Sequence, residues 1–480
     1  MLSKKVRLSE MPRHEQSHAL TYGSRYLAEP IPKYRMPDRS MPANVAYQII
    51  HDELNLDGNP ALNLASFVTT WMEPEAEKLM METLNKNYVD QDEYPQTTEI
   101  QNRCVNMLAH LLHAPDDETG VGTATVGSSE AIHLAGLALK WNWRTRRRAQ
   151  GKPAEKPNLV MGHNVQVCWE KFARYFEVEP RYVPLTDDRY VLGVDEALAR
   201  VDENTIAVVG ILGSTYTGQY EPIKELNHAL VELNRTTGWE VPIHVDAASG
   251  GFVAPFTSPD IVWDFRLPLV KSINLSGHKY GLVHPGVGWI VWRNHTELPE
   301  DLIFHVNYLG GDQPTFNLNF SRGANQIIAQ YYNFLRLGQE GYTRIMQNLQ
   351  ATARYLTERL ASTGKFDVLS RLGDLPVVAF ALKDPDRFTV FDVSARLRQR
   401  GWIVPAYTMA PNAQQIAVLR VVVRENLSRD MADMLLGDVL RAVADLEASS
   451  LPSPQPPPIS LPLDISGPLC DVAATPHGVC

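Results

Sequence analysis

The sequence predicts an α/β fold in which helices cover a mostly parallel sheet. From Thr123 onward, short apolar runs alternate with segments of helical periodicity. The runs are apolar on both faces, which is typical of strands in a parallel sheet that is buried on both sides. Alternation of such strands with helices indicates βαβ units. The strand-like runs are Asn158 to Met161, Thr205 to Leu212, Pro242 to Asp246, Lys271 to Leu275 and Val287 to Trp292.

The part of the chain before this series is different in character. Residues 1 to about 43 are polar, and their prolines exclude a long helix. From Val45 to His113 the apolar pattern is helical, as in residues 75–84. A further helix is expected over Ala131 to Arg147.

A smaller α+β domain is expected after the strand series. A long helix over Ala324 to Leu337 and more helices to about Ser362 precede it, and Ser428 is a plausible N-cap for its last helix. Its strands are expected near Val377 to Leu382, Trp402 to Tyr407 and Ile416 to Arg424. A proline-rich, extended tail follows. The predicted division is an N-terminal segment 1–60, a large domain 61–365, a small domain 366–450 and a tail 451–480.

Composition narrows the class of function. The chain has 480 residues and a net charge of −10, which argues against nucleic acid and against anionic lipid as partners. No apolar run is long enough to span a membrane, and the cations of residues 1–10 are not followed by an apolar stretch, so a secretory signal is not expected. Four cysteines make no disulfide framework. The cytoplasm is the expected location.

Lys279 is the first candidate for chemistry. It lies in Ser276-Gly277-His278-Lys279-Tyr280-Gly281, directly after a predicted strand. A lysine at a strand end, flanked by glycines, can reach a bound carbonyl with little steric hindrance, which is how pyridoxal phosphate is held as a Schiff base. For this lysine alone, a surface position in a turn would be the better interpretation.

Two other features strengthen the case, one at a strand end and one at a helix start. Asp246 ends the run His244-Val245-Asp246, where a carboxylate can keep a pyridine nitrogen protonated, although many such residues only cap the next helix. Ser128 and Ser129 lie in Gly127-Ser128-Ser129-Glu130, before a predicted helix whose N-terminus can bind a phosphate. A simple helix cap explains that tetrapeptide equally well. The order phosphate cradle, Asp, Lys is that of fold-type-I pyridoxal enzymes.

The sequence closely resembles the bacterial and plant-type glutamate decarboxylases, members of the group II pyridoxal-phosphate-dependent decarboxylases. The resemblance covers about Ala43 to Glu447. It rests on long matching segments, which few other families would supply in this order. They are Asn85-Lys86-Asn87-Tyr88-Val89-Asp90, Glu93-Tyr94-Pro95-Gln96, Ala247-Ala248-Ser249-Gly250-Gly251-Phe252, Ile261-Val262-Trp263-Asp264-Phe265-Arg266 and Asn319-Phe320-Ser321-Arg322.

The resemblance implies roles in binding pyridoxal 5'-phosphate. Lys279 would carry the cofactor and Asp246 would pair with its ring nitrogen. The phosphate would be held by Ser128, Ser129 and His278, and by Ser321 from a neighbouring subunit. Gln166 would lie over the ring, Thr215 would contact the region of the ring hydroxyl, and Ala248 would pack beneath the ring. Lys279, Asp246, Gln166 and His278 are the expected catalytic residues.

The resemblance also implies a substrate site. Arg420 would bind a carboxylate of L-glutamate by its bidentate fork. Ser66, Phe67, Asn87 and Asp90 would surround the distal carboxylate. Ser66 departs from the family pattern, in which Thr is expected, and this puts the packing of the distal pocket in question. The implied reaction is α-decarboxylation to 4-aminobutyrate and carbon dioxide, which consumes a proton and suggests a role in acid resistance.

Partners and regulation follow the same resemblance. A homodimer with a shared active site, or a hexamer built from such dimers, is expected. Calmodulin control is not, because the tail has almost no cations. His477 is a candidate for closing the site at higher pH. His14-Glu15-Gln16-Ser17-His18 fits a zinc-protease pattern by chance, and no metal is expected.

Other interpretations stay open. The same chemistry could act on aspartate, cysteine sulfinate or an aromatic amino acid. Aldol-type cleavage of a phosphorylated amino alcohol occurs in related folds but would not need Asn87 and Asp90. A non-catalytic regulator that binds the cofactor is disfavoured because Lys279, Asp246 and Arg420 are all present.

Overall fold

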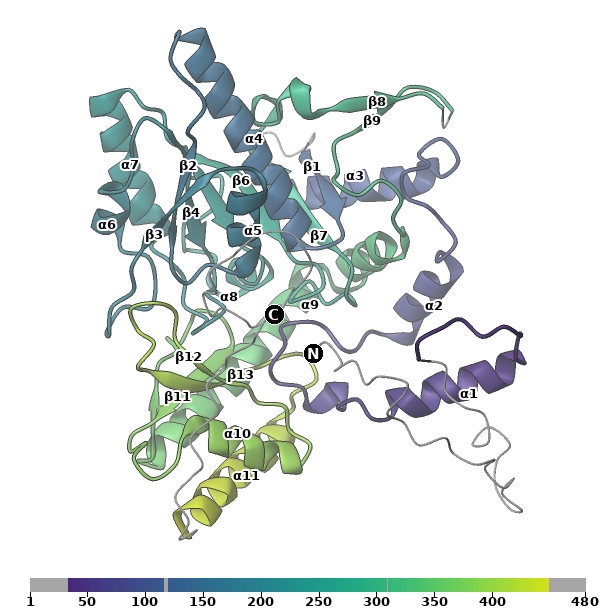
Figure 1. Ribbon diagram of the computed structural model, residues 1–480, viewed down its shortest axis with the longest axis vertical. Coiled ribbons are helices and arrows are strands. Elements are labelled where there is room, and N and C mark those ends of the chain that lie inside the picture. Colours follow the sequence, from purple (N-terminus) through teal and green to yellow (C-terminus); the bar gives the residue numbers. More distant parts are fainter. Residues whose placement is uncertain (1–32, 116–119, 309, 449–480) are drawn as a thin grey trace. The chain divides into compact units, whose positions relative to one another are not determined.

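The computed structural model describes residues 33–115, 120–308 and 310–448, and they belong to two compact units, Met1–Asn59 and Pro60–Cys480 (Figure 1). In the described part of the first unit, helix α1 (Ala43–Leu54) follows Pro42. The second unit contains every predicted site residue. The segment with His14 and His18 and the tail with His477 lie outside the described residues.

A seven-stranded sheet forms the centre of the second unit, in the order β1-β7-β6-β5-β4-β2-β3 (Figure 1). Neighbouring strands from β3 to β6 are parallel, whereas β7 runs antiparallel to both β6 and β1. The strands are β1 (Val121–Thr125), β2 (Asn158–Gly162), β3 (Glu179–Val183), β4 (Thr205–Ile211), β5 (Ile243–Asp246), β6 (Val270–Leu275) and β7 (Gly288–Trp292). The α/β fold is therefore confirmed.

Strand β7 was expected to be parallel to the other strands, but it is antiparallel to both of its neighbours. Only residues 276–287 separate it from β6, and they form turns without a helix. Parallel neighbours need a longer crossover, usually helical, so this short connection returns the chain antiparallel. Strands β1 and β3 were not predicted. Both are edge strands, and the first two residues of β3 are exposed.

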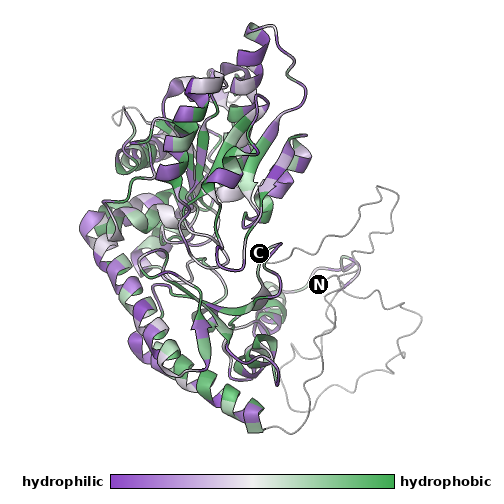
Figure 2. Ribbon diagram, turned by 90° about the vertical axis from the view of Figure 1, so that its left-hand side faces the viewer, coloured by the Kyte–Doolittle hydropathy of each residue, from purple (hydrophilic) through white to green (hydrophobic). Residues whose placement is uncertain are grey.

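Helices cover both faces of the sheet. Every residue of β2, β4, β5 and β7 is buried, and within β4 Val208 belongs to one apolar cluster while its neighbours Ala207 and Val209 belong to another. Figure 2 shows these strands mostly in green, while the helices carry both colours. The surrounding helices are α2 (Pro74–Glu82), α3 (Pro95–Leu111), α4 (Ser128–Ala149), α5 (Val167–Tyr175), α6 (Val194–Leu198), α7 (Ile223–Thr237) and α8 (Ala254–Thr257).

Helix α9 (Asn325–Ser362) packs against helices α2, α3 and α8, and also against strands of the second sheet described below. Its one non-helical residue is Gly338, with φ 56° and ψ −170°. This break comes directly after Leu337, the residue at which the first predicted helix was expected to end, so the expected helices to about Ser362 are confirmed. Before α9, strands β8 (Phe304–Val306) and β9 (Gln313–Thr315) form a short hairpin.

A second, antiparallel sheet has the order β10-β11-β13-β12. Ser428 caps its last helix as predicted, because its Oγ accepts a hydrogen bond from Met431 N at 3.2 Å. The expected strand over Trp402 to Tyr407 is wrong in its first half, where Ile403 pairs with residues 62–64 instead. The elements are β10 (Phe366–Val368), β11 (Val377–Leu382), α10 (Val390–Gln399), β12 (Ala406–Thr408), β13 (Ala417–Val422) and α11 (Arg429–Ala448).

Both sheets lie in one compact unit, so the predicted boundary between residues 365 and 366 stays a prediction. Among the residues that the structure describes, none of the helices has both the length and the apolar character needed to cross a membrane.

Candidate active site

Two adjacent strand ends bring Lys279 and Asp246 to the same edge of the sheet. Asp246 is the last residue of β5, and Lys279 follows the end of β6, its parallel neighbour. The Lys279 Nζ donates a hydrogen bond to Ser249 Oγ at 3.2 Å, three residues beyond Asp246. Polar groups at the carboxyl ends of parallel strands are where α/β proteins bind ligands.

The Lys279 amine is tuned by its surroundings. Part of the side chain is accessible, but the amine lies deep in the fold, and this burial lowers its pKa. Arg420 lowers the pKa further, whereas the negative charge of Asp246 opposes the shift. A lowered pKa increases the fraction of neutral amine, which is the nucleophilic form.

Asp246 is held by three donors. Its Oδ2 accepts from Trp169 Nε1 at 2.8 Å, and its Oδ1 accepts from Asn274 Nδ2 at 3.0 Å and from Ala248 N at 3.1 Å. Together these donors hold the carboxylate in one orientation. Neither Trp169 nor Asn274 was singled out from the sequence. The signal for Asn274 was present, since it is a polar residue within the apolar strand Lys271 to Leu275.

The start of α4 adjoins the loop that carries Lys279. Gly127 is the N-cap residue and makes no side-chain cap, so Ser128 and Ser129 begin the helix with their backbone N–H groups at its positive end. Ser128 Oγ lies 2.6 Å from Ser276 Oγ, and Ser129 is exposed. A Cβ on Gly127 would come within 3.2 Å of the His278 ring, so glycine keeps this approach open.

His278 has an unused polar atom. Its Nδ1 is buried and has no hydrogen-bond partner. Burial, followed by the charge of Lys279, lowers its pKa to about 4, so the ring is neutral near pH 7. A buried polar atom without a partner is uncommon and indicates a group that a ligand completes.

Arg420 and Phe67 form the third side. One Arg420 Nη donates to the carbonyl of Thr215, and the other donates to the carbonyl of Ala65 at 2.6 Å. Its Nε is buried without a partner. The Phe67 ring centre lies 5.4 Å from Lys279 Nζ and 5.0 Å from Arg420 Cζ. These distances join Lys279, Phe67 and Arg420 into one group.

Four other predicted site residues form hydrogen bonds with protein groups. Ser66 Oγ accepts from Val68 N at 3.1 Å, and Gln166 Oε1 accepts from Cys168 N at 2.7 Å and so caps α5. Thr215 contributes its carbonyl to Arg420. Ala248 contributes its N–H to Asp246.

Asn87, Asp90 and Ser321 form a separate group. Asn87 Nδ2 lies 3.3 Å from Asp90 Oδ1 and 3.4 Å from Ser321 Oγ, while its Oδ1 accepts from Arg322 N at 3.1 Å. Among the described residues, no hydrogen bond or ion pair joins these three side chains to Ser66, Phe67, Lys279 or Arg420. The predicted substrate residues thus fall into two groups within one chain.

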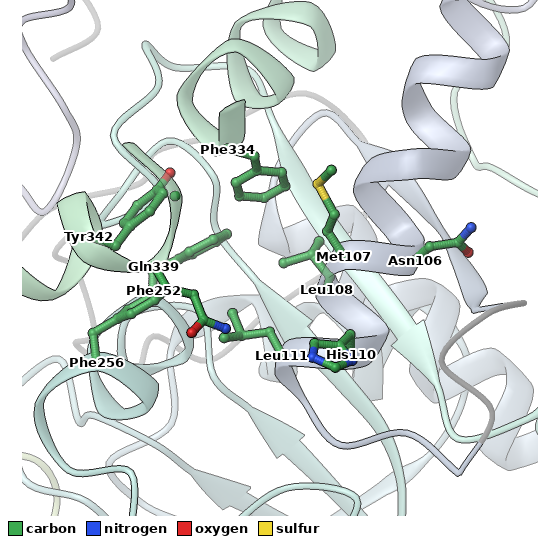
Figure 3. Close-up of a pocket in the computed structure, with 11 residues that line it drawn as sticks. Asn106, Met107, Leu108, His110, Leu111, Phe252, Phe256, Phe334, Gln339 and Tyr342 are labelled. Atoms are coloured by element: carbon green, nitrogen blue, oxygen red, sulfur yellow. The ribbon is translucent and has the colours of Figure 1, made fainter. Parts of the chain in front are cut away.

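An apolar cavity of about 470 Å³ lies elsewhere, between α3, α8 and the break in α9 (Figure 3). None of the predicted site residues lines it. It is connected to the lysine loop, since Tyr342 in its wall donates to the carbonyl of Gly281 at 2.9 Å. Its lining includes Met107, Leu108, Leu111, Phe252, Phe256 and Phe334.

Comparison with known proteins assigns the family. Residues 37–383 match the pyridoxal-dependent decarboxylase conserved domain. The chain is 62% identical over 435 residues to the glutamate decarboxylase of Solanum lycopersicum, covering 90% of this chain and 87% of that protein. The chain belongs to the pyridoxal-dependent glutamate decarboxylases.

Two further members support the assignment. Identity to the glutamate decarboxylase of Aliivibrio fischeri is 52% over 426 residues, covering 88% of this chain and 91% of that one. Among solved structures, the Lactobacillus brevis glutamate decarboxylase has a TM-score of 0.86 at 46% identity, covering 89% of this chain and 98% of that one. The recognised family and the fold-type-I architecture are both confirmed.

Pyridoxal phosphate is the cofactor of this family, and the residues at the strand ends fit it. Lys279 offers a buried amine, and Asp246 offers a fixed carboxylate beside it. The Nδ1 of His278 lacks a partner, and the start of α4 offers N–H groups suited to a phosphate. The individual residue roles stay proposals.

Proposed function

We propose that the chain removes the α-carboxyl group of L-glutamate to give 4-aminobutyrate and carbon dioxide, with uptake of a proton. The observation that carries the proposal is the position of the buried Lys279 amine and of Asp246 at adjacent strand ends, with Arg420 and Lys279 against the same Phe67 ring. The glutamate decarboxylases to which the chain is similar support this choice of substrate.

The cofactor, when bound through Lys279, supplies an electron sink for the bond that breaks. Asp246, oriented by its three donors, is suited to pair with the ring nitrogen. The start of α4 and His278 would hold the phosphate. These contacts would hold the cofactor in one orientation, so that the surrounding residues can fix the conformation of a bound substrate.

Arg420 is the proposed carboxylate-binding residue. Its guanidinium is already oriented by the carbonyls of Thr215 and Ala65, so little conformational freedom is lost when substrate binds. Phe67 and Tyr407 lie against it, with Tyr407 5.5 Å from its Cζ. Their apolar rings would exclude water and favour loss of charge as carbon dioxide leaves.

A shared site in a homodimer, or in a hexamer of such dimers, is part of the proposal. If Ser321 reaches the phosphate of a neighbouring subunit, then Asn87 and Asp90 must accompany it, because all three lie in one group. Ser66 and Phe67 would then belong to the other subunit. The distal carboxylate of glutamate would therefore be enclosed by both chains.

Cellular setting is also a proposal. The two described cysteines, Cys104 and Cys168, are free and buried, which suits the reducing cytoplasm. Uptake of a proton in each turnover would make acid resistance a useful role. Independence from calmodulin stays a prediction, because the tail lies outside the described residues.

The direct test measures carbon dioxide and 4-aminobutyrate from L-glutamate with added pyridoxal phosphate. Aspartate, cysteine sulfinate and aromatic amino acids serve as competing substrates. We expect glutamate to be preferred and Lys279→Ala to abolish turnover. Faster reaction with another acid, or full activity of Lys279→Ala, would reject the proposal.

A further inference from the structure

A chain of hydrogen bonds continues behind Asp246 into the core. His244 and Asp246 lie on β5, and they pair across the parallel ladder with Ser272 and Asn274 on β6. Residues two apart point to the same face of a strand, so all four side chains meet on one face of the sheet. His244 Nδ1 lies 2.7 Å from Ser272 Oγ, and its Nε2 lies 2.8 Å from Asn274 Oδ1.

The donor and the acceptor of every hydrogen bond in this network can be assigned. The carboxylate of Asp246 can only accept, so Asn274 must turn its Nδ2 to it and its Oδ1 to His244. The amide oxygen also only accepts, so His244 carries its proton on Nε2. The His244 Nδ1 is then an acceptor for the Ser272 hydroxyl. All donors therefore point toward Asp246.

The electrostatics agree with this single arrangement. Burial lowers the pKa of His244 to about 4, so the ring is neutral and carries one proton. His244, Ser272 and Asn274 are completely buried, and the Trp169 ring lies 5.1 Å from the His244 ring. A fully satisfied buried network strengthens each of its hydrogen bonds and specifies one geometry.

The donors also determine which atom of Asp246 is left for a ligand. A carboxylate offers about four acceptor sites, two on each oxygen. Asn274 and Ala248 occupy both sites of Oδ1, and Trp169 occupies one site of Oδ2. The open acceptor site is therefore the second one on Oδ2.

We propose that Trp169, Asn274 and His244 are positioning residues that hold Asp246 in one orientation and present Oδ2 to the ring nitrogen of the cofactor. The inference rests on the proposed role of Asp246. The effect of each residue should decline along the chain. Asn274 touches the carboxylate, His244 orients Asn274, and Ser272 orients His244.

The test compares Trp169→Phe, Asn274→Leu and Ser272→Ala with Asp246→Asn. In each, the dissociation constant for pyridoxal phosphate, the visible absorption of the bound cofactor and the melting temperature are measured. We expect Asn274→Leu and Trp169→Phe to weaken cofactor binding by about ten-fold or more and to shift the absorption band. Ser272→Ala should have a smaller effect.

Asn158→Leu is the matched control for loss of stability. Asn158 is also completely buried in the same sheet and also makes two side-chain hydrogen bonds, to Asp202 Oδ1 at 2.8 Å and from Thr205 Oγ1 at 2.7 Å. It begins β2, so it lies away from the strand ends that form the site. It should lower the melting temperature but leave cofactor affinity and absorption unchanged.

Two outcomes separate the inference from the proposal beneath it. If Asp246→Asn weakens cofactor binding while Asn274→Leu and Trp169→Phe behave like Asn158→Leu, the positioning role is wrong and the role of Asp246 stands. If Asp246→Asn leaves cofactor binding and absorption unchanged, both the role of Asp246 and the inference fail.

Discussion

Arg420 illustrates how a single residue is prepared for its task by the main chain. Its two Nη atoms bind the carbonyls of Thr215 and Ala65, which come from distant parts of the sequence. A lysine can occupy the same space but offers one ammonium group in place of a planar fork. The residue is therefore sensitive to a change that keeps its charge.

Arg420→Lys should lower kcat/KM for glutamate by about ten- to hundred-fold, because one or more charge-assisted hydrogen bonds are lost. The visible absorption of the cofactor should be retained. Steady-state kinetics and absorption spectra check this. Arg293→Lys is the control, because Arg293 also donates to main-chain carbonyls, those of Phe265, Leu267 and Val270. These carbonyls lie before and at the start of β6, at the end of the strand away from the site. Equal kinetic losses in both variants would contradict the assignment.

Glu221 is a second residue with an unusual environment. It is buried and accepts hydrogen bonds from Asn164 Nδ2, Leu192 N and Ile211 N. Burial nevertheless raises its pKa from 4.5 to about 7. Between these values the folded chain binds more protons at Glu221 than the unfolded chain does. Its contribution to the free energy of unfolding therefore falls as pH rises through this window.

Glu221→Gln removes this titration. The free energy of unfolding of the variant minus that of the unchanged chain should increase by on the order of 3 kcal/mol as the pH rises from 4.5 to 7.5. Urea unfolding at several pH values measures it. Glu225→Gln, at an exposed position of α7, is the control. A constant difference between Glu221→Gln and the unchanged chain would show that the carboxyl does not titrate there.

At the scale of elements, the break in α9 depends on glycine. Gly338 has φ 56° and ψ −170°, a combination that residues with a Cβ rarely adopt. A Cβ there would meet no atom within 4 Å, so any penalty comes from the backbone alone.

Gly338→Ala should lower the free energy of unfolding by about 1–3 kcal/mol. Gly437→Ala is the matched control, because Gly437 lies inside α11 and the atom nearest to its added Cβ is Arg441 Nη2 at 3.9 Å. That change should stabilise the fold by up to about 1 kcal/mol. Denaturant unfolding measures both. If Gly338→Ala also stabilised the protein, the conclusion that the backbone conformation at residue 338 requires glycine would be wrong.

Local pattern predicted many of the elements. The strand Val377 to Leu382 matches β11 residue for residue, because a buried strand bounded by turns has a strong local signal. The direction of β7 and the pairing of Ile403 with residues 62–64 were not predictable in this way. Both depend on which distant segment the chain meets.

The site shows the same limit. Lys279, Asp246 and Arg420 were found from strand ends and from resemblance, and the structure brings Lys279 and Arg420 to the same Phe67 ring. Trp169 was not found, because nothing in its own helix indicates that its indole reaches Asp246, 77 residues later. That contact exists only once α5 has packed on the sheet.

At the scale of the whole molecule, the separation of Asn87, Asp90 and Ser321 from the Lys279 group invites a mixing experiment. Lys279→Ala and Asn87→Ala chains should each have little activity alone. If the site is shared, a mixed dimer holds one site with both native residues. Random mixing of equal amounts should recover about a quarter of full activity, because half of the dimers are mixed and each has one such site.

The assay is carbon dioxide release after unfolding and refolding the two variants together. Refolding each variant alone and combining them immediately before the assay is the control, because the chains then have no shared refolding step in which to form mixed dimers. No recovery in the mixed sample would place both residues in a site made by one chain.

Strand β13 ties the site to the end of synthesis. It carries Arg420, and just beyond it the buried Arg424 donates to the carbonyls of Pro60, Asn63 and Val68, the segment that brings Ser66 and Phe67 to the lysine. Of the strands in the described residues, β13 is the last that the ribosome makes. A nascent chain therefore contains Lys279 and Asp246 before it contains Arg420, the residue proposed to bind the substrate carboxylate. Chains that stop before β13 would lack the proposed contact to the substrate carboxylate even though they contain Lys279 and Asp246.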